Sequence, residues 1–164
     1  MTVTTSRKAV VTLPTDTQIL ITREFDSPKH LVYRAYTEPA LVKRWWSEDR
    51  GEVTSVDADP RLGGKWRNVM RANDGSEVAF HGEYREIVPN ERLVVTDVYE
   101  GIPDPESAAA LVTITFTERE GRTILTSLMD LPSKDIRDAI ISSGMEGGLQ
   151  ESYDHLEEVV RSLR

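Results

Sequence analysis

The sequence contains no cysteine among its 164 residues, and this absence excludes several kinds of site at once. Disulfide bonds, thiolate nucleophiles, cysteine-ligated zinc and iron–sulfur clusters all need that residue. The lack of cysteine also fits a reducing compartment, so we expect a cytoplasmic protein. Histidine is scarce too, since His30, His81 and His155 lie far apart and none stands in a metal-ligand spacing. We therefore expect no metal and no cofactor.

Long apolar runs and basic runs are also missing. The apolar stretches are a few residues long, whereas a membrane-spanning helix needs roughly 20, so we expect no membrane insertion. The first residues have no apolar segment of the kind found in a signal peptide. Acidic side chains outnumber basic ones by 28 to 20, which gives a net charge of −8. Because neutralising phosphates requires a basic stripe, we expect no nucleic-acid partner.

What is present is typical of a globular protein, with 38% hydrophobic and 29% charged residues. The length favours one domain. We expect residues 1–14 to form a polar N-terminal arm and residues 15–164 to form a single domain. The apolar cluster Val10, Val11 and Leu13 is compatible with an edge strand, but its place near a terminus favours a loose arm.

Two short helices are predicted directly after a first strand over residues 19–25. Ser27 is expected to cap the first helix, because its side chain can accept a hydrogen bond from the first turn, and Pro28 needs no partner there. Pro39 opens the second helix in the same way, and we expect that helix to continue to about Trp46.

From residue 52 to residue 130 the apolar period becomes two, which indicates strands. Short connections rich in Gly, Asn, Asp and Pro separate them, and such short connections force antiparallel neighbours. The connection over 101–110 is longer and predicts a mobile loop. Together with the first strand, this pattern predicts a curved antiparallel sheet of about seven strands. The six further strands are 52–57, 64–71, 77–88, 92–100, 111–118 and 123–130.

A long helix is predicted at the C-terminal end, after a shorter one over 134–142. Ser143 and Glu146 match the capping box S-x-x-E, which marks a helix start. Gly147 and Gly148 are expected to remove side-chain bulk where the helix passes the sheet or opens a cavity. The apolar residues that follow recur at spacings of three and four, and only the sheet can cover such a stripe. They are Met145, Leu149, Tyr153, Leu156, Val160 and Leu163.

Five segments spread over residues 15–163 carry a family resemblance. They are 22–28 (TREFDSP), 41–46 (LVKRWW), 59–66 (DPRLGGKW), 82–93 (GEYREIVPNERL) and 144–148 (GMEGG). With the order of elements, they resemble the SRPBCC superfamily, which includes START-type lipid carriers, polyketide cyclases and birch-pollen-allergen-type proteins. They are most similar to the branch related to the activator of the 90-kDa heat-shock protein ATPase. The resemblance implies an α+β helix-grip fold, in which the sheet wraps round the long C-terminal helix, and a hydrophobic ligand pocket without a shared catalytic set.

A cavity between sheet and helix would be concave and mostly apolar, which is the usual setting of a small-molecule site. Asn68 could orient a polar ligand group there, and burial of Asp97 would disfavour its ionisation. We predict that ten inward-facing residues bind the ligand. They are Trp46, Trp66, Asn68, Phe80, Tyr84, Asp97, Tyr99, Met129, Leu149 and Tyr153.

Three functions stay open at this point. The first is binding of a small hydrophobic molecule in the cavity. The second is a cyclase- or hydrolase-like enzyme in the same cavity, where Asp97, Tyr84 or His81 would do acid–base chemistry, although no catalytic residue is assigned. The third is a chaperone-associated protein-interaction module, which needs an exposed docking surface. A homodimer and a protein partner are both left open.

Overall fold

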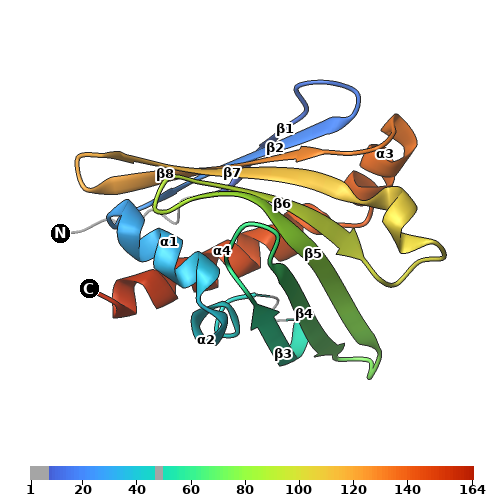
Figure 1. Ribbon diagram of the computed structural model, residues 1–164, viewed down its shortest axis with the longest axis horizontal. Coiled ribbons are helices and arrows are strands. Elements are labelled where there is room, and N and C mark those ends of the chain that lie inside the picture. The colour runs from blue at the N-terminus through green and yellow to red at the C-terminus, as the bar shows by residue number, and fades with distance from the viewer. Residues whose placement is uncertain (1–7, 47–49) are drawn as a thin grey trace.

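The computed structural model describes residues 8–46 and 50–164, which form one curved antiparallel sheet with α4 across its concave side (Figure 1). Eight strands in these ranges lie in the order β1-β2-β8-β7-β6-β5-β4-β3. The predicted helix-grip fold is confirmed, with one strand more than expected. The strands are β1 (Val10–Thr12), β2 (Gln18–Phe25), β3 (Gly51–Ala58), β4 (Lys65–Ala72), β5 (Glu77–Val88), β6 (Arg92–Tyr99), β7 (Ala110–Arg119) and β8 (Arg122–Asp130).

The helices flank the concave face. They are α1 (Lys29–Thr37), α2 (Pro39–Val42), α3 (Lys134–Ser142) and α4 (Met145–Ser162), and a short 3₁₀ helix, η2 (Pro105–Ala108), lies between β6 and β7. In Figure 1, α1 lies beside the C-terminal half of α4. The helix predicted to reach Trp46 ends at Val42 and continues as turns. None of the helices in the described ranges is long and apolar enough to span a bilayer.

Two irregularities in strand pairing help the sheet to curve. The register of β3 against β4 shifts between Val53 and Ser55, and the register of β5 against β6 shifts between Tyr84 and Glu86. A bulge of this kind bends its strand and increases the local twist. The sheet therefore closes round α4 instead of lying flat.

The turn between β7 and β8 follows from its sequence. Arg119 pairs with Arg122, so only Glu120 and Gly121 form the loop. Both loop residues have positive φ, 54° and 76°, as a two-residue hairpin turn of the I′ type requires. Gly121 adopts this conformation without steric cost, and the tight turn keeps β7 and β8 in register along their length.

The apolar stripe of α4 packs on the sheet, as predicted, and it does so mainly through its C-terminal half. The edge of the Tyr153 ring meets Phe25 of β2, with the ring centroids 6.0 Å apart. Leu149, one turn earlier, is only partly buried. The side chains that α4 buries are Tyr153, Leu156, Val159 and Val160.

A buried arginine fixes α4 along β2. The Arg23 side chain is only 2% exposed, and its guanidinium donates to Asp154 at 3.1 Å and to Glu157 at 3.4 Å. The same guanidinium lies over the Phe25 ring, 5.2 Å from its centroid. Because a buried charge is tolerated only when it is paired and hydrogen-bonded, α4 must present both carboxylates at this point.

Residues 10–12 form the edge strand β1, so the loose arm expected there is wrong for this part; residues 1–7 of the arm lie outside the described residues. The cause is a distant side chain. Gln150 of α4 accepts a hydrogen bond from the Ala9 N–H at 2.9 Å and donates one to the Ala9 carbonyl at 2.7 Å. A carboxamide 141 residues away thus satisfies the backbone that leads into β1.

Two predicted helix caps are wrong. Pro28 is the residue that caps α1, while the Ser27 hydroxyl donates to the carbonyl before it at 2.7 Å. α4 begins after Gly144, whose φ of 82° is left-handed, and the Ser143 hydroxyl donates to the Ile140 carbonyl of α3 at 2.6 Å. In both places the hydroxyl donates backwards to a preceding carbonyl instead of accepting from the helix ahead.

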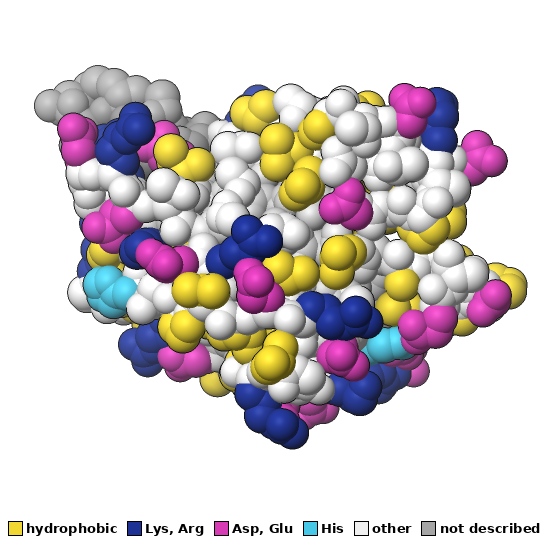
Figure 2. Space-filling view, turned by 45° about the horizontal axis from the view of Figure 1, so that its top comes forward, with side chains coloured by type: hydrophobic (Ala, Val, Ile, Leu, Met, Phe, Trp, Pro, Cys, Tyr) yellow, Lys and Arg dark blue, Asp and Glu magenta, His cyan; other side chains and the backbone are white. Residues whose placement is uncertain are grey.

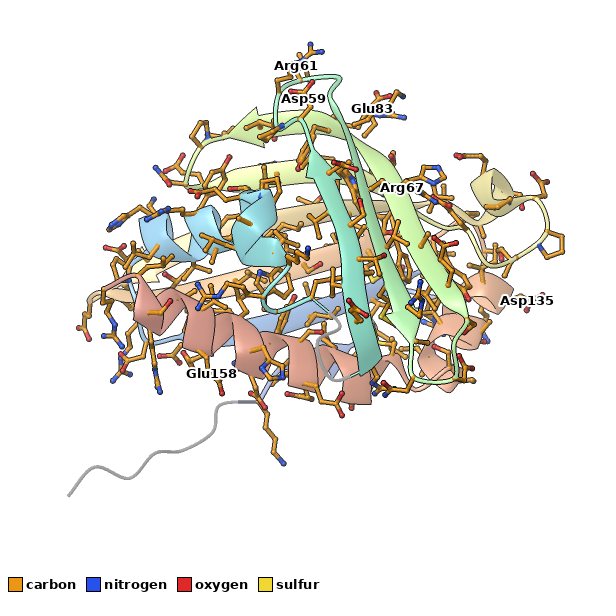
Figure 3. All side chains as sticks on the ribbon, turned by 90° about the horizontal axis from the view of Figure 1, so that it is seen from below. Asp59, Arg61, Arg67, Glu83, Asp135 and Glu158 are labelled. Carbon is orange, nitrogen blue, oxygen red and sulfur yellow. The ribbon has the colours of Figure 1, made fainter. Side chains whose placement is uncertain are left out.

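The Arg23 cluster yields a test with a neighbouring control. Glu157→Gln removes the better buried of the two carboxylates that balance Arg23, and we expect the free energy of unfolding to fall by about 2 kcal/mol. Glu158→Gln changes an exposed side chain that points away from the sheet (Figure 3), and it should shift stability by less than about 0.5 kcal/mol. Urea unfolding of the two variants checks this, and equal midpoints would contradict it.

Candidate functional site

A cavity of about 410 Å³ lies between the concave face of the sheet and the N-terminal half of α4. Ligand pockets commonly measure roughly 300–1,000 Å³, so this one can hold a small organic molecule. Strands β2 to β8 all contribute to its wall, together with α1, α2 and α4. Its aromatic lining consists of Tyr36, Trp45, Trp46, Trp66, Phe80, Tyr84 and Tyr153.

The structure brings together nine of the ten predicted site residues. They line this one cavity and are Trp46, Trp66, Asn68, Phe80, Tyr84, Asp97, Met129, Leu149 and Tyr153. Tyr99 does not line it, so its predicted place in the wall is wrong. Strand alternation puts Tyr99 on the same face as Asp97, but β6 ends there, and the side chain is 42% exposed. Its ring packs against Phe80 outside the cavity, with the centroids 5.1 Å apart.

The adjacent tryptophans after α2 divide their roles. Trp45 is buried and its indole N–H donates to the Ala35 carbonyl of α1 at 2.9 Å, which anchors the turns after α2 to α1. Trp46 is less buried and meets the Phe80 ring edge-on, with the centroids 5.8 Å apart. The sequence suggested this division, because neighbouring helical residues point about 100° apart.

Two important wall residues were not among those predicted. Tyr36 lies on the apolar face of α1, which was visible as a helical spacing, but its aim into the cavity depends on how α1 sits against the sheet. Arg50 lies at the start of β3 and forms an ion pair with Glu151 of α4 at 3.0 Å. No local pattern marks this pair, because 101 residues separate its members.

Gly82 allows the Trp66 indole to lie against the sheet. The two residues pair across β4 and β5. A Cβ at residue 82 would lie 2.6 Å from Trp66 Nε1 and 1.8 Å from the Thr96 carbonyl oxygen, so the position excludes any side chain. Trp66 Nε1 is buried, and no hydrogen-bond acceptor for it lies within the described part of the chain.

Several polar groups face the cavity from different elements. They are the Asp97 carboxyl, the Asn68 amide and the hydroxyls of Tyr36, Tyr84 and Tyr153. Among the described residues, none of these five groups finds a hydrogen-bond partner. These groups line the cavity and are not bonded to other described side chains, so they can form hydrogen bonds with a molecule in it.

Burial controls the ionisation of these groups. It raises the pKa of Asp97 to about 6, an effect that His81 opposes. It also raises the pKa of Tyr84 to about 12 and raises the pKa values of Tyr153 and Tyr36. The negative charge of Asp97 also helps to raise the pKa of Tyr36, which indicates that the two groups lie near each other. At neutral pH the tyrosines are therefore hydrogen-bond donors, and Asp97 is mainly ionised.

His81 does not line the cavity. Its Nδ1 lies 2.7 Å from a Glu100 oxygen, and its Nε2 lies 2.8 Å from Glu106 of η2. Arg67 also binds Glu100, and its hydrogen bond is the main reason why the pKa of that carboxyl falls to about 2. This cluster joins the 101–110 connection to the outside of the sheet, so an acid–base role for His81 in the cavity is wrong. Throughout residues 8–46 and 50–164, no group of three His, Asp or Glu side chains is arranged to hold a metal ion.

The family model for activator of Hsp90 ATPase homolog 1-like protein matches residues 26–161. The chain belongs to this family. The matched range includes every element that lines the cavity except β2. Among curated proteins, none matches this chain.

Solved structures of bacterial proteins share the family fold. A Rhodobacter sphaeroides protein is 24% identical, has a TM-score of 0.87 and is matched over 94% of this chain and 99% of its own. A Chromobacterium violaceum protein is 27% identical, with a TM-score of 0.76 over 89% and 98% of the two chains. A Mycobacterium smegmatis protein is 22% identical, with a TM-score of 0.82 over 92% and 96%.

Asp97→Asn is expected to raise the free energy of unfolding at about pH 7.5 by about 2 kcal/mol. The pKa of about 6 in the folded protein exceeds the ordinary value near 4 of an unfolded chain. The carboxyl therefore contributes stability that is full below about pH 4 and is lost as the pH rises through 6. Urea unfolding of both proteins at about pH 4 and about pH 7.5 checks this. The variant should match the parent protein at the lower pH, and a variant less stable at the higher pH would contradict it.

Proposed function

We propose that the protein binds a small, mainly hydrophobic molecule in the cavity between the sheet and α4. The observation that carries this proposal is an interior space of about 410 Å³ whose wall combines seven aromatic side chains with five polar groups, on Asp97, Asn68, Tyr36, Tyr84 and Tyr153, that have no hydrogen-bond partner among the described residues. Unfilled space and unpaired polar groups both cost stability, so a fold without a ligand would be expected to fill or pair them. A cytoplasmic location, which the lack of cysteine permits, is part of this proposal.

Two adjacent glycines of α4 support the same conclusion. Gly148 lines the cavity, while Gly147 is exposed. A glycine inside a helix costs about 1 kcal/mol relative to alanine, so a pair of them near the start of α4 weakens this helix. What Gly148 contributes in return is room in the cavity wall for the Arg50 side chain, whose Nη2 would lie 3.3 Å from a Cβ at this position.

The two alternatives have less support. An enzyme in this cavity would need groups set against each other for acid–base work, and Asp97 is the one wall carboxyl in the described ranges. The family description refers to activation of a chaperone ATPase, which is an activity of protein surfaces. On the face in Figure 2, basic and acidic side chains alternate and hydrophobic ones lie in small groups, an arrangement that favours no particular partner.

The glycine pair provides a matched test. Leu at either position raises helix propensity, so neither variant should unfold the protein. Gly148→Leu places a side chain in the cavity wall, and Gly147→Leu places it outside. We expect N-phenylnaphthylamine, an uncharged dye that fluoresces in apolar surroundings, to bind the parent protein and Gly147→Leu alike. Gly148→Leu should weaken binding by about tenfold or more, because the added side chain takes ligand space.

Fluorescence titration measures these affinities, and native mass spectrometry of freshly purified protein reports the stoichiometry. Binding of one dye molecule per chain that is weakened only in Gly148→Leu supports the proposal. No dye binding by the parent protein, or equal binding by all three proteins, would overturn it and direct attention to protein partners.

A further inference from the structure

We infer that the cavity selects an aromatic molecule that carries a protonated amine, and that the amine pairs with the Asp97 carboxylate. This inference rests on the proposed function, since it names the class of ligand for the same cavity.

The first step concerns the charged groups of the wall, which in the described part of the chain are Asp97 and Arg50. Arg50 lies at the rim, where its side chain is about half exposed and its Nε donates to Glu151 at 3.0 Å. The charge of Arg50 is thus already balanced by a neighbour on α4. The charge of Asp97 has no such neighbour.

The surroundings of Asp97 explain why it stays unpaired. It shares its face of β6 with the apolar wall residues Leu93 and Val95. The nearest cation on an adjacent strand would be His81, but that ring is turned to the outside of the sheet, where Glu100 and Glu106 hold both of its nitrogens. A half-buried carboxylate among apolar wall residues is costly unless a donor reaches it, and among the described residues no hydrogen-bond donor does.

The aromatic side chains of the wall favour a ligand with a cationic head group over one with a neutral hydrogen-bond donor. Seven aromatic rings line a space that holds one carboxylate. Ring faces attract a cation through their quadrupole, and this attraction grows when the cation is removed from water. An ammonium group therefore gains from both the Asp97 charge and the rings, whereas a hydroxyl gains one hydrogen bond and a carboxylate is repelled.

The test uses one aromatic body with three head groups. Naphthylethylamine, naphthylethanol and naphthylacetate of the same isomer compete with N-phenylnaphthylamine for the parent protein at neutral pH. We expect the amine to bind about tenfold or more tightly than the alcohol, and naphthylacetate to bind weakest.

Two isosteric variants test which carboxylate causes the preference for the amine. Asp97→Asn should remove the preference for the amine over the alcohol. Asp57→Asn removes an exposed charge outside the cavity and should keep the preference, which controls for the acidic net charge. Circular dichroism confirms that both variants are folded.

The outcomes separate this inference from the proposal on which it rests. If the alcohol and the dye bind in the cavity but the amine has no advantage, the inference fails and small-molecule binding stands. The inference also fails if the preference persists in Asp97→Asn or is lost equally in Asp57→Asn. If neither the dye nor any naphthyl compound binds the parent protein, the proposed function itself fails.

Discussion

The packing of one amphipathic helix against a sheet that curves round it governs the rest of this structure. The C-terminal half of α4 meets the sheet closely, through Tyr153 and the residues after it, and the ion pairs of Arg23 fix its position. The N-terminal half crosses the wider part of the curve, where Gly148 contributes no side chain to the cavity wall. The cavity is therefore a direct result of how side-chain volume is distributed along α4.

That distribution has a thermodynamic meaning. An empty cavity and an ionised Asp97 both lower the stability of the folded chain. Under the proposed function, a molecule that filled the space and donated to Asp97 would bind the folded state alone, and it would stabilise the fold in proportion to the logarithm of its concentration relative to Kd. On that proposal, the residues that make the free protein less stable are the same residues that would favour the bound state.

Periodicity was sufficient to predict most of the fold and most of the cavity wall. The period of two gave the strands, and the stripe that includes Leu149 gave α4, because each pattern depends on a face that must be buried. The predictions that were wrong concerned residues whose structure depends on distant contacts or on where a strand ends. Gln150 holds the residue before β1, and no local pattern links it to residue 9. Tyr99 has the right alternation but lies where β6 leaves the cavity. Caps such as Ser143 failed because a hydroxyl can donate backwards as easily as it accepts.

The turn of α4 that covers the cavity is attached to its surroundings at two successive residues, by bonds of different physical kinds. Gln150 joins the backbone of Ala9 through two neutral amide hydrogen bonds, and Glu151 joins Arg50 through an exposed ion pair. Dissolved salt screens the second attachment and leaves the first almost unchanged. Ionic strength therefore loosens this turn from Arg50, just before β3, while it stays fastened to the N-terminal edge.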